Sequence, residues 1–231
     1  MMRCKLIGYA AVVVLFGTSM KLSGDVLVDG PPVGLNCLPF GCPSEADVTE
    51  YQQLYAASNF PSAVTINGLT FFYTFLPPGE TRGEGLAQGG NFVVALSTVT
   101  ADVSTFNNLI QAGPDNRVLF SGSLDGFFLP YFSSFTLGGG TFFYDPTKGN
   151  LLMDVLISGA PLSSSGGGLD SSASALGIFS RATNGSNTGT VGVGLDTRFD
   201  TVPEPPTFGL VAGGGLIALG RLVPIRRQSR K

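Results

Sequence analysis

Residues 144–155 have the sequence YDPTKGNLLMDV, in which a tight turn separates two apolar segments. Asp145 can accept a hydrogen bond from the turn backbone, Pro146 presets a turn value of φ, and Gly149 tolerates a positive φ. The flanking residues include aromatic and β-branched types, which pack well on a pleated sheet. The stretch therefore predicts strand, tight turn, strand.

The same pattern of short apolar or alternating segments separated by turn residues continues in both directions from this turn. Turn signals such as Gly113-Pro114 and the Gly166–Gly168 triplet fall between the segments. The predicted strands are 25–28, 48–55, 64–75, 92–99, 117–124, 141–144, 151–158, 175–181 and 191–199. This arrangement predicts an all-β fold, an antiparallel β-sandwich of jelly-roll type, with a β-barrel as the main alternative.

Two segments allow more than one interpretation. Residues 44–58 could form a helix, with Ser44 as N-cap and Asp47 three residues on, but tyrosines alternate with other side chains through 49–55 and favour a strand. Residues 127–135 contain five aromatic side chains. A buried aromatic cluster is the simpler explanation, and an exposed platform that stacks on sugar rings is the alternative.

The composition excludes several kinds of chemistry. The chain has no histidine, so neither a Ser-His-Asp nor a Cys-His nucleophile system is available, and the commonest zinc sites lose their ligands. Both ends of the chain are basic, whereas the body between residues 24 and 204 has 5 basic and 15 acidic residues, a net charge of −10. Such a body repels nucleic acid and anionic membranes.

The N-terminal residues 1–24 have the pattern of a secretory signal peptide, in which a short basic region precedes about a dozen apolar residues. Cleavage after Ser19 or after Gly24 would each leave a small residue at the cut, and a buried helix is the alternative interpretation. Export would expose Cys37 and Cys42 to an oxidising compartment. We expect these two cysteines to form a disulfide that closes a short loop.

The C-terminal residues 202–231 have three parts in order. Val202, Pro203, Glu204 and Pro205 come first, an uncharged glycine- and leucine-rich segment follows, and a basic tail ends the chain. As a helix, 207–220 would be about 21 Å long, shorter than the ~30 Å hydrocarbon core of a bilayer. The basic tail consists of Arg226, Arg227, Arg230 and Lys231, with Arg221 closer to the apolar segment.

This three-part terminus resembles the PEP-CTERM sorting signal. The resemblance covers about 30 residues, and its motif falls on Pro203, Glu204 and Pro205. It implies recognition by a membrane exosortase, cleavage near the motif and delivery to the cell surface or an exopolysaccharide matrix. An ordinary single-span tail anchor is the alternative. Residues 144–155, together with the run from Tyr51 to Tyr55, also resemble the extracellular body common among PEP-CTERM proteins, which carries no agreed activity.

The candidates for chemistry in the body are few. Glu80 and Glu84 could serve a carboxylate-dependent reaction, but their glycine-rich context predicts a solvated loop. Oxygen ligands for Ca²⁺ could come from Asp145, Asn150 and Asp154. A second possible source is the adjacent pair Asp115 and Asn116. No spacing matches a known calcium loop, and we predict no catalytic residues, resident metal or cofactor.

We therefore expect an exported, non-enzymatic structural or adhesive protein that signal peptidase and an exosortase process, and that touches the membrane only in transit. A carbohydrate-binding module is the first alternative, with Tyr131, Phe132 or Tyr144 stacking on sugar rings of a polysaccharide. A carboxylate-dependent glycoside hydrolase or lyase is the second.

Overall fold

The computed structural model describes residues 24–41, 47–74, 84–85, 90–124, 128–129, 132–159, 168–174, 177–185 and 189–202. Residues 23–205 form one compact unit. Residues 1–23 of the predicted signal peptide, Cys42, Glu80, Tyr131 and the chain after Val202 lie outside the described residues.

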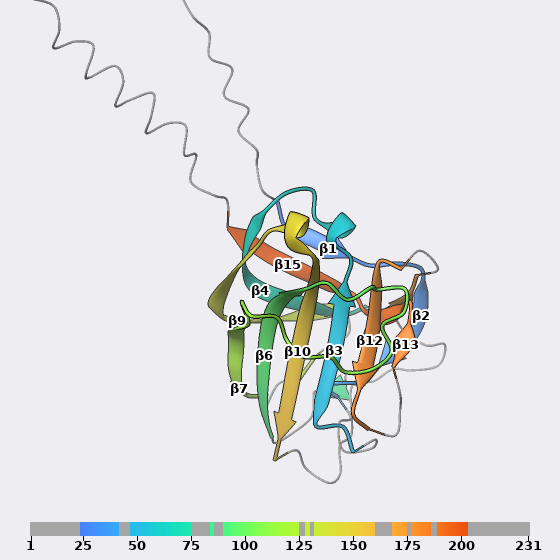
Figure 1. Ribbon diagram of the computed structural model, residues 1–231. Coiled ribbons are helices and arrows are strands. Elements are labelled where there is room, and N and C mark those ends of the chain that lie inside the picture. Colours follow the sequence, from blue (N-terminus) through green and yellow to red (C-terminus); the bar gives the residue numbers. More distant parts are fainter. Residues whose placement is uncertain are drawn as a thin grey trace, which may run out of the picture. The chain divides into compact units, whose positions relative to one another are not determined.

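The described chain is all-β, and every strand pair in it is antiparallel, as predicted. Two larger sheets face each other, an arrangement compatible with a β-sandwich (Figure 1). One sheet has the order β1 (Val26–Val28), β15 (Thr197–Val202), β4 (Val64–Tyr73) and β9 (Ser133–Tyr144). The other has the order β13 (Thr190–Val191), β12 (Phe179–Thr183), β3 (Glu50–Tyr55), β10 (Asn150–Ser158), β6 (Asn91–Val99) and β7 (Arg117–Ser123).

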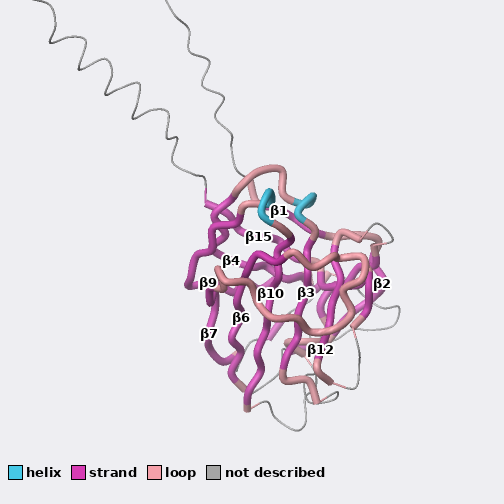
Figure 2. Tube along the Cα trace, in the orientation of Figure 1, coloured by secondary structure: helices cyan, strands magenta, loops and turns pink. Residues whose placement is uncertain are grey.

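Two smaller sheets complete the described strands. The first has the order β14 (Val193–Leu195), β11 (Leu169–Ala173) and β2 (Pro32–Asn36), and the second pairs β5 (Glu84–Gly85) with β8 (Phe128–Leu129). Two short 3-10 turns, η2 (Ala57–Asn59) and η3 (Pro146–Lys148), lie beside each other at one end of the body (Figure 2). Glu84 is thus part of a short strand rather than of the loop that we predicted.

The turn between β9 and β10 has the predicted chemistry. The Asp145 side chain accepts hydrogen bonds from the Thr147 N–H and hydroxyl, Pro146 occupies the first turn of η3, and Gly149 has φ +148°. A Cβ at Gly149 would lie 2.4 Å from the Val99 carbonyl oxygen. Glycine is therefore required here both by its backbone conformation and by the close approach of β6.

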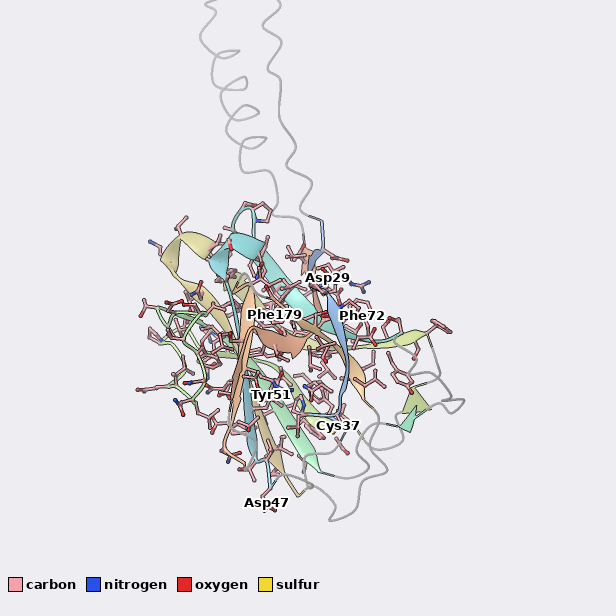
Figure 3. All side chains as sticks on the ribbon, turned by 90° about the vertical axis from the view of Figure 1, so that its right-hand side faces the viewer. Asp29, Cys37, Asp47, Tyr51, Phe72 and Phe179 are labelled. Atoms are coloured by element: carbon pink, nitrogen blue, oxygen red, sulfur yellow. The ribbon has the colours of Figure 1, made fainter. Side chains whose placement is uncertain are left out.

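The core between the two large sheets is rich in aromatic rings. Tyr55 and Phe199 meet edge to face with ring centroids 4.9 Å apart, and Phe60 contacts both Tyr144 and Phe199 at similar distances. Figure 3 labels Tyr51 and Phe179, which come from the neighbouring strands β3 and β12 and are both fully buried. Residues 50–55 are a strand, which confirms our preference over a helix for the predicted segment 44–58 where it is described.

One side of the body is closed where β7 and β9 meet. These strands are edges of different sheets, and they pack closely at the Gly138–Gly140 triplet. A Cβ at Gly140 would lie 2.4 Å from the Val118 carbonyl oxygen and 3.1 Å from the Leu119 Cα. The triplet therefore lies inside a long strand and permits contact between two backbones.

We expect Gly140→Ala to lower the free energy of unfolding by about 2 kcal/mol, because the added methyl group meets backbone atoms that cannot move aside easily. Chemical denaturation monitored by circular dichroism measures this change. Gly122→Ala is the matched control, since its Cβ would meet only the mobile end of the Phe120 ring at 3.3 Å. Equal stabilities of the two variants would contradict this account of the Gly138–Gly140 triplet.

Candidate functional site

The outer face of the six-stranded sheet is partly covered by residues 100–116, which connect β6 to β7 and are called the covering segment below (Figure 1). Val103 and Phe106 of this segment are buried against the sheet, where Leu54 and Leu152 are fully buried. An open recess of about 650 Å³ lies along the two ends of the segment and the end of β6. The segment thus forms a second, smaller apolar core outside the sandwich.

Polar side chains of the sheet hold the covering segment in place. The Gln52 side chain bonds Ile110 in both directions: its Nε2 donates to the Ile110 carbonyl at 2.8 Å, and its Oε1 accepts from the Ile110 N–H at 2.9 Å. The Ser180 hydroxyl donates to the Val103 carbonyl at 2.7 Å. These bonds satisfy backbone groups that lack a strand partner, so they fix the path of an otherwise irregular segment.

A pair of carboxyl groups lies beside this attachment. The Gln52 Nε2 is 3.0 Å from the Glu50 Oε1 and 3.5 Å from the Asp154 Oδ1, so the two acids share one amide donor. The pKa of Asp154 is raised to about 6, mainly by burial and then by the Glu50 carboxylate, while the Gln52 hydrogen bond acts in the opposite direction. Among the described residues, this place resembles an acid–base pair, because two carboxyl groups share one amide donor and the pKa of one of them, Asp154, is raised to about 6.

A second group of acids surrounds the end of β14. Asp170 accepts hydrogen bonds from the Thr74 N–H and hydroxyl. The pKa of the nearby Asp196 is raised to about 6, mainly by burial; a hydrogen bond from the Ser172 side chain opposes this rise, and the carboxylates of Asp170 and Asp29 add to it. The Oδ1 of Asp196 is buried without a hydrogen-bond partner. The raised pKa means that the ionised form of Asp196 is disfavoured in the folded protein.

The structure corrects one of the predicted sugar-stacking residues. Tyr144 is fully buried, its ring packs on Phe60, and its hydroxyl donates to the Gly149 carbonyl at 2.7 Å. The prediction that Tyr144 stacks on a sugar is therefore wrong. Phe132 is 74% exposed, whereas Phe135 is buried against Phe71, so the described part of the predicted aromatic cluster is divided between surface and core.

The residues that we considered as calcium ligands form hydrogen bonds with different parts of the chain. Asp145 bonds within its own turn, Asn150 bonds Ala57 and Ala101, and Asp154 lies four positions further along β10. In the neighbouring pair, Asp115 accepts the Thr98 N–H. No group of three acidic or sulfur ligands able to hold a metal is found within the described ranges.

The predicted processing and disulfide residues are mostly beyond the described chain. Val202 ends β15, but Pro203, Glu204, Pro205 and the basic tail lie outside. The pairing of Cys37 with Cys42 stays a prediction for the same reason. None of the helices in the described part of the chain is long and apolar enough to cross a membrane.

Known proteins provide no further assignment. No protein-family model, curated protein or solved structure matches this chain. Sequence reasoning missed the pair Glu50 and Asp154, although the alternation through 49–55 already placed Glu50, Gln52 and Leu54 on one face of a strand. What the sequence lacks is the register that brings Asp154 opposite Gln52.

We expect Gln52→Leu to lower the free energy of unfolding by about 2 kcal/mol, because it leaves the Ile110 N–H and carbonyl without their partners. Hydrogen exchange should be faster in the covering segment than in the two large sheets. Gln111→Leu, an exposed change within the same segment, is the control. Unchanged exchange at Ile110 in the Gln52 variant would contradict the role given to this side chain.

The raised pKa of Asp154 predicts a pH dependence of stability. A carboxyl group with a folded pKa of about 6 and an ordinary value of 3.8 binds its proton more tightly when folded. Its contribution to stability is therefore complete below pH 4 and is lost as the pH rises through 6. We expect Asp154→Asn to raise the melting temperature at pH 8 and to leave it nearly unchanged at pH 4.

The control for this experiment is Asp145→Asn. Hydrogen bonds from the Thr147 side chain and backbone lower the pKa of Asp145, so its ionised form is the one that stabilises the fold. This variant should lower the melting temperature at pH 8, opposite in sign to Asp154→Asn. The same sign for both variants would refute the assignment.

Proposed function

We propose that this chain is an exported, non-catalytic structural or adhesive protein that a membrane exosortase sorts to the cell surface or an exopolysaccharide matrix. In this proposal residues 1–24 are a signal peptide removed by signal peptidase, 25–201 are an extracellular body and 202–231 are a sorting signal. The body is then a sandwich of jelly-roll type, and the Cys37–Cys42 disulfide braces its N-terminal part.

One observation carries the proposal: the two ends of the body lie together. β1 pairs with β15, with Val26 opposite Phe199. Asp25 Oδ1 accepts the Thr201 N–H at 3.1 Å, and the Gly24 carbonyl accepts the Thr201 hydroxyl at 3.3 Å. The residues next to both predicted processing sites are therefore hydrogen-bonded to each other.

This arrangement suits a chain that is held in one membrane at both ends. Paired residues of neighbouring strands lie about 5 Å apart, so a signal peptide and a C-terminal segment can leave the body at nearly the same point. The body can then fold before either end is cleaved. From the end where β1 and β15 lie, β10 runs toward the opposite end of the sandwich (Figure 1).

Particular residues favour two other functions, carbohydrate binding and a carboxylate-dependent glycoside hydrolase or lyase. The exposed aromatic side chains Phe132 and Phe143 favour carbohydrate binding. For a glycoside hydrolase or lyase, Glu50 and Asp154 replace Glu80 and Glu84 as the candidates, because they share one amide donor and burial raises the pKa of Asp154. Loss of a hydrolytic activity in Asp154→Asn, with folding intact, would support an enzyme.

The sorting proposal is tested by the intact mass and cellular location of the chain with and without a co-expressed exosortase. We expect a product that lacks both ends, found outside the cell only when the enzyme is present. Glu204→Ala should leave a full-length C-terminus in the membrane, whereas Glu84→Ala, outside the motif, should be processed normally. A membrane-held, uncleaved C-terminus in every strain would instead make residues 202–231 a simple anchor.

A further inference from the structure

The outer face of the four-stranded sheet carries a row of connected polar side chains. Leu27 of β1 lies opposite Arg198 of β15, which lies opposite Thr70 of β4, which lies opposite Thr136 of β9. The Arg198 Nε donates to the Asp200 Oδ1 at 2.8 Å, and an Arg198 terminal nitrogen donates to the Thr70 hydroxyl at 3.2 Å. The row is therefore held in one orientation by its own hydrogen bonds.

The network extends in both directions from this row. Thr70 donates to the Asp200 Oδ2 at 2.8 Å and shares a 2.6 Å hydrogen bond with Thr136. Asp25 Oδ2 lies 3.7 Å from the Arg198 Nε, and the Arg198 and Asp25 side chains are 39% and 47% exposed. Solvent reaches Asp25, Arg198 and Thr136, whereas Thr70 is fully buried and links Arg198, Asp200 and Thr136 by hydrogen bonds.

Aromatic rings lie on either side of the polar row. Phe143 is 57% exposed and lies opposite Thr65, which lies opposite Val202. Phe72, labelled in Figure 3, follows Thr70 on the same face of β4 and is partly exposed, whereas Phe71 and Tyr73 on either side of it face the core. Phe72 is seven residues beyond Thr65 on β4, so at about 3.4 Å per residue the two rings are about 24 Å apart along the strand.

The charge of this face of the four-stranded sheet indicates what kind of partner it can bind. The single guanidinium of Arg198 lies between the carboxylates of Asp25 and Asp200, so the face offers no net positive charge to an anionic polymer. The body as a whole carries a charge of −10. Guanidinium, carboxylate and threonine hydroxyl groups together donate to and accept from neighbouring hydroxyl groups, and aromatic rings cover the apolar faces of sugar rings.

We infer that the outer face of the four-stranded sheet binds a neutral polysaccharide chain, with Phe143 stacking on one sugar ring and the Arg198–Asp200–Thr136 row bonding the hydroxyl groups of rings further along the same chain. The inference rests on the proposed function, because only an exported body would meet such a polymer. It assigns the partner to a surface formed by β1, β15, β4 and β9, and not to the predicted residues Tyr131, Phe132 and Tyr144.

Affinity electrophoresis of the purified full-length chain in a mild non-ionic detergent tests the inference. The gels contain dextran, hydroxyethyl cellulose or galactomannan as neutral polymers, and alginate as an acidic polymer. We expect at least one neutral polymer to retard the chain and alginate to have no effect. Phe143→Ala should weaken the retardation about fivefold to tenfold.

Two further variants separate binding from folding. Thr136→Val keeps the shape and strand preference of the side chain but removes a hydroxyl, and it should also weaken binding. Leu156→Ala removes an apolar side chain that is 47% exposed on the other large sheet, and it should bind like the unaltered chain. Circular dichroism of each variant confirms that the fold is kept.

Three results would overturn the inference: no retardation by any neutral polymer, unaltered binding by both Phe143→Ala and Thr136→Val, or retardation by alginate alone. A dimer that Phe143→Ala disrupts, without polymer binding, would show that the face joins two copies of the chain instead. Because processing and location are measured separately, a correctly sorted chain that binds no polymer would refute this inference and leave the sorting proposal standing.

Discussion

Strand β10 is the constraint on which most of the body depends. It pairs along its length with β3 on one side and β6 on the other, with Met153 opposite both Gln53 and Leu96. Since side chains alternate between the two faces of a strand, a shift of one residue would move the fully buried Met153 and Val155 out of the core. The turn at Asp145–Gly149 fixes where this strand begins and thereby fixes the register of its neighbours.

Polar groups inside the core then connect the sheets to one another. Gln53 is fully buried, and its side chain donates to the Leu195 carbonyl, accepts the Leu195 N–H and accepts the Tyr51 hydroxyl. The Tyr55 hydroxyl is 2.8 Å from the Thr197 hydroxyl across the sandwich. A satisfied buried network specifies one arrangement of strands, because any slip would leave several buried groups without partners.

The sequence alone was sufficient to predict the strands that are bounded by recognisable turn residues. The Asp145–Gly149 turn, the strand nature of Glu50–Tyr55 and the apolar alternation of β10 are all visible without a structure.

The sequence did not predict β2, β11 and the first half of β9, because these segments are rich in Gly, Pro or Ser. Strand β12 begins later than predicted. Gly138–Gly140 has the composition of a turn, but Gly138 pairs with Gly68 of β4 and Gly140 lies against β7, and the sequence shows neither approach. Tyr144 was misplaced because a tyrosine next to a turn can face either way, and the partner that buries it, Phe60, is distant in sequence.

The two large sheets use their outer faces differently, and this difference bears on function. On the six-stranded sheet, Gln52 and Ser180 hold the covering segment, so their donors and acceptors are occupied by that segment. On the four-stranded sheet, comparable polar groups bond to one another across β15, β4 and β9 and remain accessible at Arg198 and Thr136. A surface whose polar groups are already oriented loses little conformational entropy when it binds a partner. Because β15 is also the strand that leads to Val202 and the predicted sorting signal, such a face would be joined directly to the point of attachment.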